Sequence, residues 1–327
     1  MSKQYFADAA KARVQITKAQ QKAIEKMYKD IAEDIEYEIK SISQRSNISS
    51  ILRTQYLNNL SMQVSQELDR LAIEQNRLIR TNMASVAAAI VKDNIILLND
   101  INIHVTDAYS YIPSDIVKEI ASGNLYKGRW NLSSAIWDNT KKTRRDINTV
   151  VAKGVAQQKS TYDIAKDLEK YVNPIKRKDW QWSKVYPGTA RVVDYNAQRL
   201  ARTMVSHAYQ DSLLRTTRNN PFVECYQWLT SNSDRVCEVC IERAEGFHGV
   251  VIGGRAMDGC YYASDVPLDH PNGMCTLDTI IDDYSDIADR LAAWVNGEDD
   301  KELDNFSRDM GYSSITLKSK VQSSKSN

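Results

Sequence analysis

The sequence predicts a mainly α protein, in which a long helical N-terminal region precedes a small α+β C-terminal lobe with a zinc-ribbon-like site. Three observations support this fold class. The first proline is Pro113 and the first glycine is Gly123, so more than one hundred residues pass without a strong breaker of regular structure. Within this stretch apolar residues recur every three or four positions, as they do along one face of a helix. Beyond Pro221 the residues alternate, are rich in β-formers and lead into a CxxC pair.

Two long helices are expected before Pro113. The first lies within residues 10–42, and the second follows the polar segment 43–50, which is the expected turn. Gln75 occupies a position of the second stripe at which the repeat predicts an apolar residue. Such stripes are usually core or partner-helix seams, so we expect the two helices to form an antiparallel hairpin. The stripes consist of Ile24, Met27, Ile31, Ile35, Ile39 and Ile42 in the first helix, and of Leu57, Leu60, Val64, Leu68, Leu71 and Leu78 in the second.

The most apolar run, residues 83–98, is interrupted by Lys92, Asp93 and Asn94. It falls short of the roughly 20 apolar residues that cross a membrane, so we expect a buried helix and no membrane partner. The N-terminus lacks the apolar core of a secretory signal, and an odd number of cysteines, five, suits a reducing compartment. Synthesis in a cytoplasm is therefore expected.

The same patterns divide the chain into consecutive regions. A chain of 327 residues can form two domains that each bury a core. The formal net charge of +1 argues against polyanion binding by the molecule as a whole, although local patches can still bind. We expect a long helical hairpin or arm at 1–112, shorter helices with basic, tryptophan-bearing segments at 113–189, a domain around a Cys/His site at 190–297, and a flexible polar tail at 298–327.

Basic clusters interleaved with tryptophans mark the middle region. Guanidinium and ammonium groups neutralise phosphates and indoles stack on bases, so this pattern suits DNA. The alternative, a solvated charged face over packed tryptophans, is the commoner cause of such a pattern. The clusters are Lys127 with Arg129, Lys141, Lys142, Arg144 and Arg145, and residues 176–178, and the tryptophans are Trp130, Trp137, Trp180 and Trp182.

Two short motifs in the C-terminal region supply a candidate metal site. Cys237 and Cys240 form a CxxC turn, and His270 with Cys275 forms an HxxxxC turn. Three thiolates and one imidazole complete a closed tetrahedral zinc site. Because such a site leaves no open position for water or substrate, the predicted metal is structural.

Several alternatives stay open for these residues. His248 or Cys260 could replace one of the four ligands, and Cys225 is expected to be buried packing on a strand. The thiols could also be plain buried cysteines with His270 capping a turn, or a thiol and a histidine could form a nucleophilic pair. For His104 and His207, which lack a second ligand at helical spacing, packing or surface roles are preferred.

Enzyme motifs are scarce in this sequence. Neither GxxxxGK[ST] nor GxGxxG follows a predicted strand, which argues against nucleotide hydrolysis and dinucleotide chemistry. Asp269 and His270 beside paired cysteines suggest an HNH-like nuclease as an alternative. That site would need a further histidine downstream, and His270 is the last one. We therefore predict no catalytic residues.

Residues 190–281 contain, in order, a helix with RLARTMVSHAYQDSLL, a strand that leads to YQWLTSNSDRVCEVC, a glycine-rich loop and then PLDHPNGMC. This order of elements resembles the head morphogenesis domain of the Mu F-like minor head proteins of phages. Family members typically end the motif in HPNCRC, where this chain has HPNGMC, with Gly273 and Met274 in place of Cys and Arg. A helical RTE in the family is Arg202, Thr203 and Met204 here. The residues that carry the resemblance are Trp228, Asp234, Arg235, Cys237, Cys240, Pro267, His270, Pro271 and Cys275.

This resemblance implies a minor capsid protein in the virion, inside the head or at the portal vertex. It implies assembly with the portal protein and with major capsid or scaffold protein, and contact with packaged DNA, for which Lys141, Lys142, Arg144 and Arg145 are the candidate residues. It brings no established catalytic set. The N-terminal helices, which the resemblance covers poorly, are the expected place for contacts with these partners and for self-association.

Overall fold

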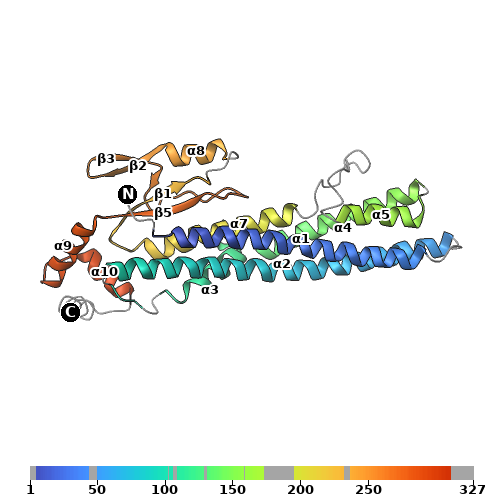
Figure 1. The fold of residues 1–327 in the computed structure, drawn as a ribbon, viewed down its shortest axis with the longest axis horizontal. Coiled ribbons are helices and arrows are strands. Elements are labelled where there is room, and N and C mark those ends of the chain that lie inside the picture. The colour runs from blue at the N-terminus through green and yellow to red at the C-terminus, as the bar shows by residue number, and fades with distance from the viewer. Residues whose placement is uncertain are drawn as a thin grey trace. The chain divides into compact units, whose positions relative to one another are not determined.

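The computed structural model confirms a mainly helical protein with a small sheet region toward the C-terminus (Figure 1). It describes residues 5–43, 50–101, 103–105, 109–128, 131–157, 159–172, 195–231 and 236–310. In these described ranges, the α-helices before the first strand are α1 (Ala7–Ser43), α2 (Ser50–Asp100), α3 (Ile112–Ser122), α4 (Leu132–Ala156), α5 (Thr161–Val172) and α7 (Tyr195–Thr217). Residues Asn124–Tyr126 add a short 3-10 helix.

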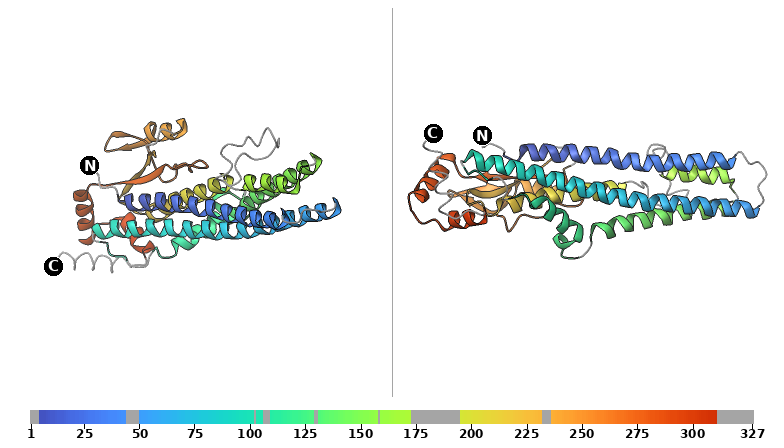
Figure 2. Two further views of the ribbon diagram at one scale, coloured as in Figure 1. Left: turned by 45° about the vertical axis from the view of Figure 1, so that its right-hand side comes forward. Right: turned by 90° about the horizontal axis from the view of Figure 1, so that it is seen from below.

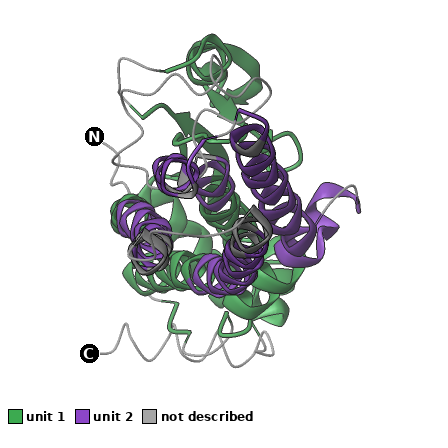
Figure 3. Ribbon diagram, turned by 90° about the vertical axis from the view of Figure 1, so that its right-hand side faces the viewer, with its two compact units in different colours: residues 1–16, 82–119, 203–327 green, residues 17–81, 120–202 purple. Residues whose placement is uncertain are grey.

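The chain forms two compact units, each built from separated stretches of sequence (Figure 3). Unit 1 comprises Met1–Ile16, Asn82–Glu119 and Thr203–Asn327, and unit 2 comprises Thr17–Thr81 and Ile120–Arg202. Helices α1, α2, α3 and α7 each contribute one end to each unit. The units therefore do not follow the consecutive regions expected from the sequence, and that division stays a prediction.

Unit 2 contains the predicted helical hairpin. In this unit α1 and α2 run side by side in opposite directions (Figures 1 and 2). Gln75, the polar interruption of the second stripe, is buried and its Nε2 lies 3.5 Å from the Tyr28 hydroxyl, so a hydrogen bond replaces the missing apolar contact. The side chains of Ile35, Ile39, Ile42 and Leu57 lie outside the described ones. Of the other stripe residues, those that are buried are Ile24, Ile31, Leu60, Val64, Leu68 and Leu71.

Unit 1 contains the sheets. Strand β1 (Val223–Leu229) is central in an antiparallel sheet of order β4-β1-β5, between β4 (Cys260–Tyr261) and β5 (Thr276–Ile281). Helix α8 (Glu238–Glu245) leads to a separate hairpin of β2 (Phe247–Ile252) and β3 (Arg255–Asp258). Gly253 and Gly254 join its strands with φ of 55° and 78°, left-handed values that glycine adopts at little cost.

The core of unit 1 packs the sheet against three helical segments: the start of α1, the end of α2 and α7. Two aromatic residues, Trp228 of β1 and Tyr209 of α7, are among the largest fully buried side chains. The shared core includes Phe6, Val86, Ile90, Leu97, Val205, Tyr209, Leu213, Tyr226, Trp228 and Leu277. Helix α7 therefore packs firmly against the sheet, and it also lies beside the loop between β4 and β5.

Helices α9 (Tyr284–Val295) and α10 (Lys301–Asp309) follow β5 in unit 1. Asp300 caps α10 by accepting bonds from two backbone N–H groups, and Arg290 of α9 donates to the same carboxylate at 2.7 Å. Leu303 and Phe306 are buried. Residues 301–309 are thus ordered helix where the sequence predicts a flexible tail, while 311–327 lie outside the described residues.

One helical segment, Asn58–Asp100, is long and apolar enough to cross a membrane by length and composition alone. Half of its most apolar window is buried inside the protein. The core helix of a soluble protein passes the same test of length and composition.

Two buried carboxylates receive the N-terminal end of α1. Asp93 of α2 accepts a 2.7 Å hydrogen bond from the Ala9 N–H, and Asp278 of β5 accepts one from the Phe6 N–H. Unsatisfied N–H groups at a helix start favour such acceptors. Burial nevertheless dominates and raises the pKa of Asp278 to about 6, with the nearby Asp93 charge adding to the effect. Burial also raises the pKa of Asp93.

This environment predicts a stability that falls as pH rises from about 4 to about 6. The folded pKa of Asp278 lies above the ordinary value of 3.8, so the native state binds more protons than the unfolded state in that window. A tenfold change in proton affinity corresponds to about 1.4 kcal/mol, so the loss of stability is at most about 3 kcal/mol. We expect Asp278→Asn to flatten this slope in urea unfolding of chelator-treated protein. An unchanged slope would contradict the assignment.

Candidate metal centre

The CxxC pair lies at the start of α8. Cys237 is the N-cap residue with extended φ and ψ of −80° and 157°, and Cys240 sits in the first turn. The Cys240 N–H bonds the Cys237 carbonyl at 2.9 Å, which closes the turn. Cys237 is exposed and Cys240 is buried. Both sulfurs therefore gather at the end of a helix where N–H groups point outward.

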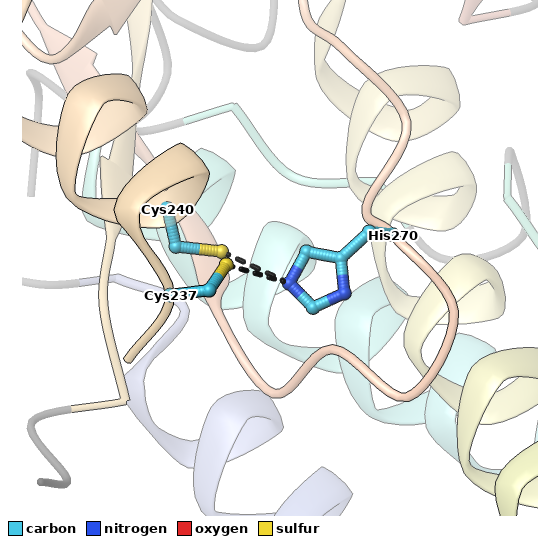
Figure 4. Close-up of side chains that lie close together, drawn as sticks. All are labelled: Cys237, Cys240 and His270. Atoms are coloured by element: carbon cyan, nitrogen blue, oxygen red, sulfur yellow. Dashed lines mark hydrogen bonds between the residues drawn. The ribbon is translucent and has the colours of Figure 1, made fainter. Parts of the chain in front are cut away.

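His270 approaches these sulfurs from the loop between β4 and β5 (Figure 4). Its Nε2 lies 3.3 Å from Cys237 Sγ and 3.2 Å from Cys240 Sγ. The three ligand atoms all lie within 4.8 Å of one another. Two sulfurs and one imidazole nitrogen that face a common point form a group that could bind a metal ion.

The orientation of the His270 ring suits metal binding. Nδ1 lies 3.1 Å from the Pro271 carbonyl oxygen, which can only accept a hydrogen bond. Nδ1 therefore carries the proton in this contact, and the Nε2 lone pair faces the sulfurs. Metal-binding histidines are commonly oriented in this way by a carbonyl or carboxylate on the other nitrogen.

Cys275 reaches the group through Cys240. Its side chain is buried in the same core cluster as Cys240, and its thiol contributes to the raised pKa of Cys240. It is not among the three residues whose ligand atoms are all mutually close. The structure thus brings three of the four predicted residues to one point, and Cys275 lies in the same buried core cluster as Cys240.

The two alternative ligands lie elsewhere. His248 stacks on Tyr261 with ring centroids 4.2 Å apart, and its Nε2 lies 2.8 Å from the Tyr261 hydroxyl. Cys260 packs against Cys225 in a small separate cluster, and the two thiols hydrogen-bond. This neighbouring thiol and burial raise the pKa of Cys225. Neither alternative joins the cluster of Cys237, Cys240 and His270, and Cys225 is buried, as the sequence predicts.

The two cysteines of the CxxC pair differ electrostatically. The Cys240 backbone N–H lowers the pKa of Cys237, and His270 contributes in the same direction. Burial raises the pKa of Cys240, with the neighbouring Cys275 and Cys237 thiols adding to the effect. A bound cation would favour the thiolate form of both residues.

A polar face of α7 holds the loop that carries His270. Thr203 accepts a 2.8 Å hydrogen bond from the Asn272 N–H. Gln210 accepts one of 2.8 Å from the Asp269 N–H, and His207 Nε2 lies 3.0 Å from the Asp269 carbonyl oxygen. His207 is a buried support of the loop and not a ligand, and burial lowers its pKa.

Asp269 and Gly273 form the inner contact of this loop. The Asp269 carboxylate accepts hydrogen bonds from the His270 N–H at 2.9 Å and from the Ser206 hydroxyl at 3.1 Å. A Cβ placed on Gly273 would overlap that carboxylate, closer than real Cβ contacts come. The close approach explains why glycine stands here. Any larger side chain at this position would require the carboxylate to move.

These supports were not predicted from the sequence. Thr203, Ser206, His207 and Gln210 recur at spacings of three, one and three on α7, a pattern that predicts a polar helix face. The other support is Arg13 of α1, whose guanidinium donates to the Met274 and Cys275 carbonyls. No local pattern could have predicted a contact across such a sequence separation.

A cavity of about 480 Å³ in unit 1 does not open onto the metal centre. Lys11, Tyr209, Trp228 and Asp278 are among its lining residues, which include none of the four predicted metal ligands. Asp269, which precedes His270, is buried and engaged with Ser206 and the loop backbone. A metal centre that lines no described cavity and has a buried, hydrogen-bonded Asp269 beside it suits a structural role.

The basic cluster of the middle region lies on α4 in unit 2. Lys141, Lys142 and Arg145 are exposed, whereas Arg144 pairs with Asp69 at 2.6 Å. The Arg144 guanidinium also lies 5.8 Å from the centre of the Trp137 ring, which is 53% exposed. Several predicted residues lie outside the described ones: Arg129, Trp130, residues 176–178, Trp180, Trp182, Asp234 and Arg235.

In comparisons with family models, with curated proteins and with solved structures, no match to this chain is found.

Proposed function

We propose that this chain is a minor capsid, or head morphogenesis, protein of a tailed bacteriophage, with a structural and interaction role at or near the portal during head assembly and DNA packaging. The resemblance of residues 190–281 to the Mu F-like minor head proteins supports this function. The observation that carries it is the convergence of Cys237, Cys240 and His270, which are among the residues that define the resemblance. The proposed role is not enzymatic.

The proposed metal is zinc, held structurally by Cys237, Cys240, His270 and Cys275. Thiolate and imidazole are the preferred ligands of structural zinc, and four of them close the coordination sphere. Cys275 shares the buried core cluster of Cys240 and perturbs the Cys240 thiol, which supports it as the fourth ligand. The bound metal would join α8 to the loop before β5.

The proposed protein partners are the portal protein, and major capsid or scaffold protein. The N-terminal helices are the proposed surfaces for these partners and for self-association, because α1 and α2 expose large apolar side chains in unit 2. Tyr37 is 74% exposed, Ile73 is 72% exposed and Met62 is 57% exposed. The proposed location is the virion, in the head interior or at the portal vertex, after synthesis in the host cytoplasm.

Packaged DNA is a further proposed partner, supported by the exposed Trp137, Lys141, Lys142 and Arg145 on α4. Phosphate contacts of this kind release counterions, so affinity for DNA should fall steeply with salt. Charge reversal at Lys141, Lys142 and Arg145 should weaken both the binding and its salt dependence. A flat salt response would remove DNA from the proposed partners.

Head assembly tests the main proposal. The protein is co-expressed with the portal, scaffold and major capsid proteins encoded beside its gene, and assembled heads are purified by sedimentation. We expect this chain at low copy in the heads and bound to isolated portal. The absence of such neighbouring genes, or of the chain from purified heads, would overturn the proposal.

The alternative function is a zinc-containing nuclease or another nucleic-acid-processing enzyme. The Asp269–His270 pair beside the cysteines supports this alternative. A cleavage assay with magnesium or manganese separates the two functions. Metal-dependent cleavage that disappears in folded His270→Ala protein would replace the structural role with the enzymatic one. The buried position of Asp269 leads us to expect no cleavage.

A further inference from the structure

Arg13 of α1 is a buried cation in contact with the loop that carries the candidate ligands. Its side chain is 1% exposed. One terminal nitrogen donates to the Cys275 carbonyl at 2.8 Å and to the Ser206 hydroxyl at 3.1 Å, and the other donates to the Met274 carbonyl at 2.7 Å. The guanidinium carbon lies 5.1 Å from the centre of the Tyr209 ring.

This environment is unusual for a buried guanidinium. Burying a charge is costly, and proteins usually compensate it with a directly paired carboxylate. The hydrogen-bond partners of Arg13 are instead neutral oxygens, two of them main-chain carbonyls of consecutive residues. Burial accordingly lowers the pKa of Arg13, and the neighbouring Tyr209 and the Asp269 carboxylate oppose that effect. The forked geometry of arginine suits two adjacent carbonyls.

The contacts of Arg13 continue to the metal ligands. Ser206 accepts from Arg13 and donates to Asp269, whose carboxylate in turn accepts from the His270 N–H. Cys275, whose carbonyl Arg13 binds, places its thiol against Cys240. Arg13 therefore contacts the loop directly at Met274 and Cys275, and indirectly at Asp269 and His270 through Ser206.

We propose that Arg13 is a positioning residue of the metal centre, and that it couples docking of the α1 N-terminal end in unit 1 to metal binding. This inference rests on the metal binding proposed above. An ordered loop presents His270 and Cys275 in place, so less conformational entropy is lost when the metal binds. Because coupling is reciprocal, the metal should in turn stabilise residues 5–16.

The test measures zinc affinity of the full chain by competition with a chromophoric chelator. Changes in residues that support metal ligands typically cost 10–100-fold in affinity, so we expect Arg13→Gln to weaken zinc binding by roughly that factor. Lys11→Gln is the matched control. It removes the same charge from the same helix, but Lys11 is exposed and bonds Asp8 at 3.2 Å.

Two further measurements separate positioning from general stabilisation. Arg13→Lys keeps the positive charge and can still donate to one or two of the same oxygens, so it should recover part of the zinc affinity. This variant also replaces Arg13→Gln in the test if Arg13→Gln does not fold. Cobalt absorption reports ligand geometry, and the charge-transfer bands of Arg13→Lys should shift or weaken. Hydrogen exchange of residues 5–16 should slow on zinc addition in the unaltered chain and less so in the variant.

The outcomes are distinct. If the unaltered chain binds zinc and both Arg13 variants bind it equally well, with unchanged cobalt spectra, Arg13 only stabilises the fold and this inference fails. A Lys11→Gln variant as weak as Arg13→Gln would assign the effect to net charge and would also overturn it. If the unaltered chain binds no zinc or cobalt, the proposed metal centre itself fails.

Discussion

Cys237→Ser is expected to abolish zinc binding and to lower the zinc-dependent stability of unit 1. The unaltered chain should contain about one zinc per chain, because one closed site takes one metal. A ligand present at a thousand times its dissociation constant stabilises the folded state by about 4 kcal/mol. The variant should lose that increment, as measured by metal analysis together with denaturant unfolding with and without zinc.

The position of Cys237 makes this experiment specific. Its side chain is exposed, so serine leaves no cavity, and it occupies the N-cap of α8, where serine is a preferred residue. In metal-free protein the variant should therefore be as stable as the unaltered chain, and the whole difference should appear only with zinc. Metal-free protein that melts like the zinc-treated protein would contradict the proposal.

Cys260→Ser is the matched control. Cys260 is buried beside Cys225 and outside the candidate metal group. Placing a hydroxyl in this apolar cluster should destabilise the protein by a similar amount with and without zinc, while metal content stays the same. If the Cys260→Ser variant lost its metal, Cys260 would be a metal ligand and the proposed ligand set would be wrong.

Gly273→Ala is expected to destabilise unit 1 by roughly 3 kcal/mol, from overpacking and from disturbed hydrogen bonds to a charged group. The new Cβ would overlap the Asp269 carboxylate, which would have to move away from the Ser206 hydroxyl and the His270 N–H. Chemical denaturation of metal-free protein measures the loss. Zinc affinity should also fall, because His270 follows Asp269 in the loop.

A double-mutant cycle with Asp269→Ala identifies the cause. When the carboxylate is absent, the same glycine substitution should cost little, so the two effects should be far from additive. Met274→Ala is the neighbouring control, since it keeps the carbonyl that Arg13 binds. Additive costs at Gly273 and Asp269 would exclude the proposed steric contact.

This contact also bears on the difference between this chain and the motif of the Mu F-like minor head proteins, which residues 190–281 are proposed to resemble. The sequence HPNGMC has Gly273 where family members have cysteine, and a side chain at that position meets Asp269. Cys275 retains its place and lies against Cys240. The departure therefore removes a residue that the loop cannot accommodate in its present conformation, and it leaves Cys237, Cys240 and His270 converging.

Local patterns predicted much of the fold because helices and strands follow short-range periodicity. The apolar stripes, which include Ile24 in the first helix and Leu60 and Leu68 in the second, correctly indicated buried helix faces. The tail was predicted less well. Its polar composition concealed α10, in which Leu303 and Phe306 are the large apolar side chains of the buried face and Asp300 supplies the cap. Composition averages over a helix, whereas burial depends on a few residues at the right spacing.

By itself, the sequence determined the helical class and the ligand types, because CxxC spacing and apolar periodicity are local properties of the chain. Only the tertiary structure decided which residues meet. It brought His270 to Cys237 and Cys240, kept His248 and Cys260 away, and placed the Arg13 guanidinium on the carbonyls beside Cys275. Such contacts join segments far apart in sequence, and their distances are set by how α1, α7 and the sheet pack in the core of unit 1.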